Sequence, residues 1–216
     1  MAYTLDLSPD ELLTTTRAVR RRLDLERPVD LKIIKDCIGI ALQAPSGSNR
    51  QGWHWVVVNH EGQRARIAEL YRAAFYEYRK LATHPGGLFA AAVNHQQRRV
   101  ARSVEYLAEN LHRVPVLVIA CIAGPSSSVL LDANQASIWG SLFPAVWSYM
   151  LAARARGLGT VWTDLHLRYE AQIAEILEIP DEIRQGAMIP TAHTIGKDFR
   201  PGPRTAVDTV LHINRW

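Results

Sequence analysis

A continuously apolar run, Pro115-Val-Leu-Val-Ile-Ala-Cys-Ile-Ala123, constrains the fold more than any other stretch of the sequence. It has the length of a strand, is rich in β-branched residues, and offers no polar position that could face water. A strand without a polar face must be covered on both sides, so we predict that it lies at the centre of a sheet. Gly124, Pro125 and a serine run end it.

Four further stretches show strand signals. Trp53–Val58 is short, aromatic and β-branched. Gly157 is predicted to cap a helix before a strand that runs to Trp162, and Gln185–Ile195 is predicted to be the last strand of the core. The tail Val207–Ile213 has enough β-branched residues for an edge strand. Because this tail lies far beyond the core in sequence, we expect it to pair on another subunit.

Helices are predicted from capping signals and from apolar residues at helical spacing. The clearest start is Ser8-Pro9-Asp10-Glu11, which combines a hydroxyl N-cap, a proline and a capping-box glutamate. Pro144 falls inside one predicted helix and is expected to kink it or to begin a new first turn. The predicted helices run from Ser8 into the basic run Arg17–Arg22, and over Asp30–Gln43, Gln63–Leu81, 88–113, Ala133–Arg156 and Tyr169–Leu177.

The length of 216 residues fits a single domain, 1–216. Within it, residues 60–113 form a helical excursion between two strands, and its loops are expected to help shape a substrate pocket. Residues 197–216 form a C-terminal extension. No apolar run approaches about 20 residues and no signal peptide is evident, so we expect a cytoplasmic protein without a membrane span.

The formal net charge of +4 is mild for a nucleic-acid binder, and an anionic small ligand explains it as well. The two cysteines, Cys37 and Cys121, each lie in an apolar run and are predicted to be buried free thiols in a reducing compartment. Neither has metal-ligand spacing, and no metal site is expected.

No motif for side-chain catalysis is present. The chain lacks a Gly-x-Ser-x-Gly elbow, a phosphate-binding P-loop and a cysteine–histidine nucleophile motif, and its eight histidines are scattered. Gly157-Leu-Gly159 lacks a third glycine and follows a helix, so it is no dinucleotide fingerprint. Trp139, Phe143 and Trp147 are expected to be core residues. A chain of this kind is either not an enzyme or leaves the hard chemistry to a cofactor.

Two polar features could bind a ligand. The turn Ala44–Trp53 closes an apolar helix and opens a strand, and its hydroxyls, amide and glycine could lie against a flat polar ligand. An ordinary helix stop is the alternative. Arg17 and Arg20 would share a face if helix persists there, and could bind a phosphate, complement the helix dipole or form a solvated face.

The turn Ala-Pro-Ser-Gly-Ser-Asn-Arg-Gln-Gly-Trp resembles the flavin-contacting turn of the nitroreductase family, with Gly52 where that pattern usually has proline. Three further stretches resemble family motifs in the same order: Thr16–Arg20, Gly157–Trp162, and the C-terminal basic segment that ends in Val210-Leu-His212. The resemblance implies an α+β fold, a three-layer sandwich with a mixed, mostly antiparallel sheet flanked by helices. It also implies a homodimer that binds FMN at the subunit interface and exchanges the C-terminal strand.

The resemblance also assigns roles to individual residues. Arg17 and Arg204 would contact the FMN phosphate, and Arg20 would lie near the ribityl chain and the pyrimidine edge. Ala18 stands where the family usually has serine, and Arg200 is the candidate substitute for the family's second C-terminal phosphate contact. The turn residues expected to line the flavin from the partner subunit are Pro45, Ser46, Gly47 and Asn49. The backbone amides of Asp164 and Leu165 would reach the flavin N5 side.

The implied activity is that of an FMN-dependent oxidoreductase. Hydride would pass from NADH or NADPH, or from a deazaflavin donor, through flavin N5 to a nitroaromatic, quinone or similar small aromatic acceptor, without an obligatory catalytic side chain. Neither nucleic acid nor membrane is expected as a partner. The alternatives are flavin fragmentation, dehalogenation or dehydrogenation on the same fold, and a non-enzymatic basic binding module.

Overall fold

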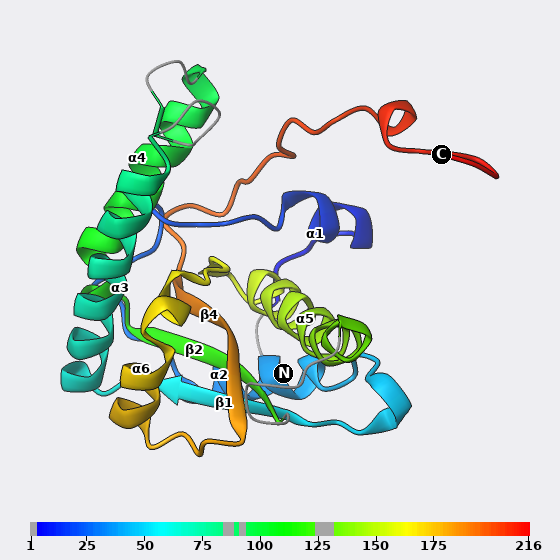
Figure 1. Ribbon diagram of the computed structural model, residues 1–216. Helices are drawn as coiled ribbons and strands as arrows, with labels where there is room; N and C mark the ends of the chain where they lie inside the picture. Colours follow the sequence, from blue (N-terminus) through cyan, green and yellow to red (C-terminus); the bar gives the residue numbers. More distant parts are fainter. Residues whose placement is uncertain (1–3, 84–88, 91–93, 124–131) are drawn as a thin grey trace.

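The computed structural model describes residues 4–83, 89–90, 94–123 and 132–216. Its centre is an antiparallel sheet in the order β1-β2-β4-β3 (Figure 1). The strands are β1 (Trp53–Val58), β2 (Val116–Ala123), β3 (Leu158–Thr160) and β4 (Ile183–His193). The apolar run lies between two other strands, so its predicted central place is confirmed.

The side chains of β2 alternate between two separate hydrophobic clusters. Val116, Val118 and Ala120 belong to one cluster, whereas Leu117 and Ile119 belong to the other. Because successive side chains of a strand point to opposite faces, this alternation means that both faces of the sheet are buried. That arrangement is the physical reason why the run contains no polar residue.

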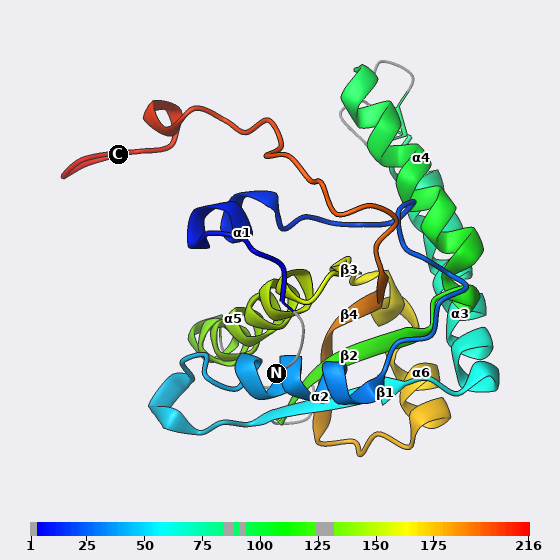
Figure 2. The same ribbon diagram turned by 180° about the vertical axis from the view of Figure 1, so that it is seen from behind.

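Helices cover both faces, which gives the expected three layers (Figures 1 and 2). Residues of α2 and α5 enter the first cluster, and residues of α3, α4 and α6 enter the second. The helices are α1 (Pro9–Thr15), α2 (Leu31–Ala41), α3 (Glu61–Leu81), α4 (His95–Asn110), α5 (Asp132–Ala155) and α6 (Glu170–Leu177). Short 3-10 turns are η1 (Gly47–Asn49), η2 (Leu111–Arg113), η3 (Leu165–Tyr169) and η4 (Val207–Thr209). None of the helices in the described ranges combines the length and the apolar character needed to cross a bilayer.

The first helix is shorter than predicted. The capping box of Ser8 and Glu11 forms as expected, but α1 ends at Thr15 and Thr16 is already extended. The chain then joins the sheet: Ala18 bridges Thr160 in parallel orientation. The prediction of a helix through Arg22 is therefore wrong, because pairing with β3 holds this segment extended. Arg17 and Arg20 share no helix face.

Two other helices test the predicted boundaries. Helix α4 begins at His95, after a capping box of Asn94 and Gln97, rather than at 88; residues 84–88 and 91–93 lie outside the described part. Helix α5 continues through Pro144. The two helices of the excursion, α3 and α4, pack side by side and extend beyond the sheet (Figures 1 and 2).

The C-terminal tail does not form the predicted strand. Val207–Thr209 is a 3-10 turn, and residues 203–216 are exposed. Figures 1 and 2 show the tail leaving the body of the chain. A strand requires a neighbour for its backbone N–H and C=O groups, and no described segment of this chain is paired with the tail. Exchange with a second subunit remains a prediction.

Candidate functional site

Arginines from opposite ends of the chain meet at Gly202. Arg17 Nη1 donates a hydrogen bond to the Arg200 carbonyl at 2.9 Å, and Arg204 Nη1 donates to the Pro203 carbonyl at 2.9 Å. A Cβ on Gly202 would lie 2.8 Å from Arg204 Nη1 and 3.6 Å from Arg17 Nη2. Both arginines are exposed, and among the described residues neither is paired with a carboxylate. Two guanidinium groups therefore have free donors close together, which suits a phosphate.

Backbone pairing with the sheet fixes the segment that carries Arg17 and Arg20. The N–H of Val19 donates to the Thr160 carbonyl at 2.8 Å. Gly159 makes this close approach possible, because a Cβ there would lie 3.0 Å from Val19 Cγ1 and 3.1 Å from Leu23 Cδ2. The second glycine of the Gly-x-Gly motif thus allows the N-terminal segment to pack on β3.

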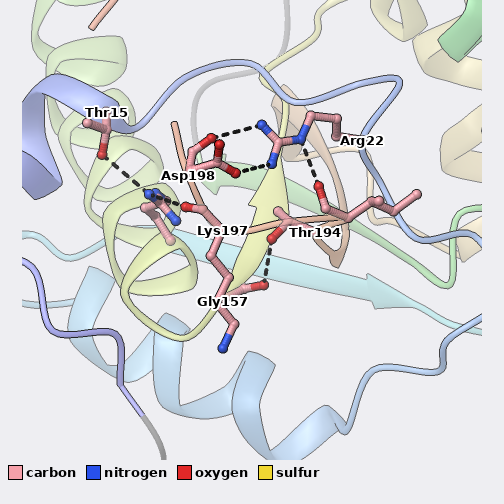
Figure 3. Close-up of polar contacts among 8 residues, drawn as sticks. Thr15, Arg22, Gly157, Thr194, Lys197 and Asp198 are labelled. Atoms are coloured by element: carbon pink, nitrogen blue, oxygen red, sulfur yellow. Dashed lines mark hydrogen bonds and ion pairs between the residues drawn. The ribbon is translucent and has the colours of Figure 1, made fainter. Parts of the chain in front are cut away.

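A network of arginines fixes the start of the C-terminal extension (Figure 3). Arg22 Nε donates to the Ile195 carbonyl at 2.7 Å, and Arg22 Nη1 donates to the Asp198 carbonyl at 3.0 Å. The Phe199 ring lies near two guanidinium carbons, 4.2 Å from that of Arg22 and 4.7 Å from that of Arg154. These contacts hold the extension beside the N-terminal segment, and Arg204 is thereby brought to Arg17.

Arg154 is the buried member of this network. Its Nη2 donates to the Lys197 carbonyl at 3.1 Å and to Thr15 Oγ1 at 3.5 Å, whereas Nε and Nη1 are buried without a hydrogen-bond partner. Burial, with a smaller contribution from the charge of Arg22, lowers the pKa of Arg154. Sequence reasoning missed this residue, which lies in the last turn of α5.

Arg20 lies deeper than Arg17. It is half-buried and its Nη1 donates to Ser103 Oγ on α4 at 3.4 Å. Burial lowers the pKa of Arg20, and the nearby Tyr71 acts in the opposite direction. Ala18, between the two arginines, is exposed next to its bridge with Thr160.

A buried hydroxyl pair supports the segment after β3. Tyr71 Oη and Thr163 Oγ1 lie 2.9 Å apart, and Thr163 exchanges two backbone hydrogen bonds with Met188, at 3.0 and 2.9 Å. Asp164 follows and is exposed, and Leu165 is half-buried. Within the described chain, the N–H groups of these two residues donate no hydrogen bond. Their amides are available to a ligand, as the sequence prediction requires.

The turn after α2 has a strained backbone. Ser48, Asn49 and Gln51 have φ values of 53°, 51° and 51°, a region that non-glycine residues rarely adopt. Hydrogen bonds maintain it: the Gln51 N–H donates to Ser46 Oγ at 3.1 Å, and the Gly47 N–H donates to Ser141 Oγ at 2.9 Å. Strain of this kind is concentrated at functional sites. It favours a ligand-binding turn over a simple helix stop.

One chain does not bring all the predicted residues together. The turn with Pro45, Ser46, Gly47 and Asn49 lies at the end of the molecule away from α1 and the C-terminal extension, as both views show (Figures 1 and 2). The arginines and the segment at Asp164 belong to the other end. The two halves of the predicted site can meet only if a second copy contributes the turn.

The family model described as "Nitroreductase family" matches residues 13–193, which span the segment of Arg17 and Arg20, the strained turn and the segment at Asp164. The chain belongs to the nitroreductase family.

Curated and solved relatives of this nitroreductase family member agree with the fold. A 4-nitrobenzoate reductase from Nocardioides sp. (strain LMS-CY) is 25% identical over 199 residues, which cover 79% of this chain and 74% of the relative. The crystal structure of an FMN- and NADPH-dependent nitroreductase from Sphigopyxis sp. strain HMH superposes with a TM-score of 0.67 at 20% identity, covering 97% of this chain and 100% of the other. Oxidised iodotyrosine deiodinase bound to FMN and 3-iodo-L-tyrosine gives a TM-score of 0.67 at 19% identity, covering 94% and 98%.

Four other residues of this nitroreductase-family chain were not predicted from its sequence. Tyr71, Thr163 and Ser103 contact or support candidate site residues. His166 directly follows the candidate residue Leu165 and is completely buried. Helical spacing identifies Tyr71 as a core residue, since Ile67 and Phe75 lie one turn away on the same face. The partner of its hydroxyl depends on tertiary packing and leaves no signal in the sequence.

Proposed function

We propose that this chain is an FMN-dependent oxidoreductase that passes hydride from NADH or NADPH to a nitroaromatic, quinone or similar aromatic acceptor, in two half-reactions. The observation that carries the proposal is the approach of Arg17 and Arg204 to Gly202, with no carboxylate on either among the described residues. Similarity to FMN-binding structures supports it. FMN would supply the hydride chemistry, which no side chain here provides.

The residues present fit this cofactor. Arg17 and Arg204 would hold the phosphate, because guanidinium groups can donate two parallel hydrogen bonds to it. The Arg200 carbonyl accepts a hydrogen bond from Arg17 and so orients it. The Arg200 side chain is exposed and would serve as the second C-terminal contact to the phosphate. A glycine at position 202 leaves room for the Arg204 guanidinium, since a Cβ there would lie only 2.8 Å from Arg204 Nη1.

Arg20 and the segment at Asp164 would act on the flavin ring. A half-buried cation stabilises negative charge that develops near it, and Arg20 meets this condition. The free amides of Asp164 and Leu165 would donate hydrogen bonds at the N5 side. Ser46, Gly47 and Asn49 of a second copy would complete the site, which makes the homodimer part of the proposal. Solvent would supply protons.

The purified protein provides the test. We expect a yellow protein, or a colourless one that takes up added FMN, with an absorption spectrum of bound oxidised flavin. It should oxidise NADH or NADPH only slowly until a nitroaromatic or quinone is added. A protein that binds no FMN would refute the proposal. A flavoprotein that reduces none of these acceptors would instead favour dehalogenation, flavin fragmentation or dehydrogenation.

A further inference from the structure

The first half of α4 carries a cluster of exposed arginines. Arg98, Arg99 and Arg102 are exposed, and His95–Ser103 contains no Asp or Glu. Across the described ranges, none of the three guanidinium groups has a hydrogen bond or an ion pair.

The acidic residues of α4 lie in its second half and are engaged with α3. Glu105 pairs with Arg79 at 2.5 Å, and Glu109 accepts a hydrogen bond from Tyr76 at 2.6 Å. Among the described residues, no acidic side chain therefore pairs with the positive charge on the first two turns of the helix.

This helix lies beside the candidate flavin site. Arg20 donates to Ser103 Oγ at 3.4 Å, and the Arg21 guanidinium lies 5.7 Å from the centre of the Tyr106 ring. Arg99 precedes Ser103 by four residues, so its side chain projects from the same helix face about 6 Å further along the axis. Arg99 is thus the next side chain beyond the Arg20 contact.

We propose that Arg99, assisted by Arg102, binds the 2′-phosphate of NADPH and makes this chain prefer NADPH to NADH. The inference rests on the proposed function and names its hydride donor. The 2′-phosphate is the only group in which the two donors differ, and at neutral pH it carries between one and two negative charges. Arginine is the side chain best suited to bind it.

The length of the donor favours this assignment over a carboxylate on the acceptor. A small aromatic acceptor takes the place of the nicotinamide against the flavin and has little reach beyond it. The adenosine end of NADPH extends far from the nicotinamide, and a cation one helical turn beyond the Arg20 contact is placed for such an extended ligand.

Arg98 is a matched control on the same helix. It is exposed and unpaired like Arg99, within the part of the chain that the structure describes. With about 100° of rotation per residue, Arg99 projects about 40° from the direction of Ser103, whereas Arg98 projects about 140° from it. The two substitutions remove the same charge from the same helix but on different faces.

The experiment compares Arg99→Gln, Arg102→Gln and Arg98→Gln by steady-state kcat/KM with NADPH and with NADH, at one saturating concentration of a neutral quinone. We expect Arg99→Gln to lower kcat/KM about tenfold with NADPH and less than twofold with NADH, as loss of a charge-assisted hydrogen bond predicts. Arg102→Gln should have a smaller effect in the same direction. Arg98→Gln should leave both values within about twofold of the unsubstituted chain.

Three results would overturn the inference: no preference for NADPH in the unsubstituted chain, equal losses with both donors in Arg99→Gln, or an equal effect of Arg98→Gln. Parallel assays with 4-nitrobenzoate and nitrobenzene test the competing role. If Arg99→Gln lowers kcat/KM more for 4-nitrobenzoate than for nitrobenzene, and equally with NADPH and NADH, the cluster binds an acceptor carboxylate. Absence of FMN binding by the purified chain is a separate outcome, because it refutes the proposed function and not only the role of Arg99.

Discussion

The phenol oxygen of Tyr71 and the hydroxyl oxygen of Thr163 lie 2.9 Å apart, in the buried layer between α3 and the sheet. The opposite face of the sheet contains a chemically identical pair, in which Tyr149 Oη lies 3.0 Å from Thr191 Oγ1. The two tyrosines belong to different hydrophobic clusters. Only the first pair adjoins the segment of Asp164 and Leu165.

This duplication gives a matched comparison of Tyr71→Phe with Tyr149→Phe. Each substitution removes one buried hydrogen bond and should lower the free energy of unfolding by about 1 kcal/mol, measured by urea titration. Only Tyr71→Phe should also change the midpoint potential of bound flavin, because Thr163 positions the amides that would face N5. Equal potentials in the two variants would show that the Tyr71 hydroxyl has a purely structural role.

The approach of Arg17 to Arg204 predicts that their contributions to FMN binding are coupled. Each alanine variant should weaken FMN binding at least about tenfold, by the loss of charge-assisted hydrogen bonds to the phosphate. The double variant should lose less than the sum of the two, since both groups bind one phosphate.

Quenching of FMN fluorescence measures these affinities. Arg168→Ala is the control, because it removes one positive charge from a surface ion pair with Glu77. Unchanged affinity in Arg17→Ala or Arg204→Ala would remove that residue from the site.

Much of the fold could be predicted because its signals are local. The caps at Ser8 and Asp30 are formed by neighbouring residues and appear as predicted. The buried free thiols of Cys37 and Cys121 are confirmed as well, and burial raises their pKa values to about 11 and about 12. The central strand followed from composition alone, since a run without polar residues fits only a fully covered strand.

The errors occur where a distant segment decides the local conformation. Nothing between Thr15 and Arg22 ends a helix by itself; the pairing of Val19 with Thr160 does so from far along the chain. The tail from Val207 has the composition of a strand but no neighbour within the described chain. Trp147 was expected in the core and is 38% exposed.

The candidate site was predictable only through the family resemblance. Arginines at positions 17 and 204 are 187 residues apart, and no periodicity relates them. The two arginines come together because Gly159 has no side chain that would prevent the N-terminal segment from packing on β3. The contacts of Arg22 with Ile195 and Asp198 then hold the C-terminal extension beside that segment. Such contacts between distant segments cannot be derived from spacing.

Two glycines with different surroundings predict opposite effects of an added methyl group: Gly186 lies at the bulge between β2 and β4, and Gly140 lies in α5. At Gly186 a Cβ would overlap Leu142 Cδ2 and lie 3.0 Å from Trp139 Cζ3, so Gly186→Ala should lower the free energy of unfolding by about 1–3 kcal/mol. At Gly140 in α5 a Cβ meets no atom within 4 Å, so Gly140→Ala should raise it by about 0.5–1 kcal/mol. Urea titration measures both, and a stable Gly186→Ala chain would show that the core relaxes around the added methyl group.

His166 predicts how stability depends on pH. The side chain is completely buried and both ring nitrogens lack a partner among the described residues. Burial lowers its pKa from 6.5 to about 4, and the charge of Glu170 opposes this shift. In the unfolded chain the imidazole becomes protonated below about pH 6.5. In the folded chain it becomes protonated only below about pH 4. The free energy of unfolding should therefore fall by about 3 kcal/mol between pH 6.5 and pH 4, and this contribution should be constant outside that range.

His166→Leu tests this interpretation against His54→Leu, which changes an exposed histidine of β1. At pH 8 the His166→Leu chain should be at least as stable as the unsubstituted one, because it no longer buries two unpartnered nitrogens. Its stability should also lose most of the slope between pH 6.5 and pH 4.5. His193, whose pKa is also lowered by burial, accounts for a remaining slope of the same sign. A slope equally steep in His166→Leu and in His54→Leu would show that other groups govern the acid response.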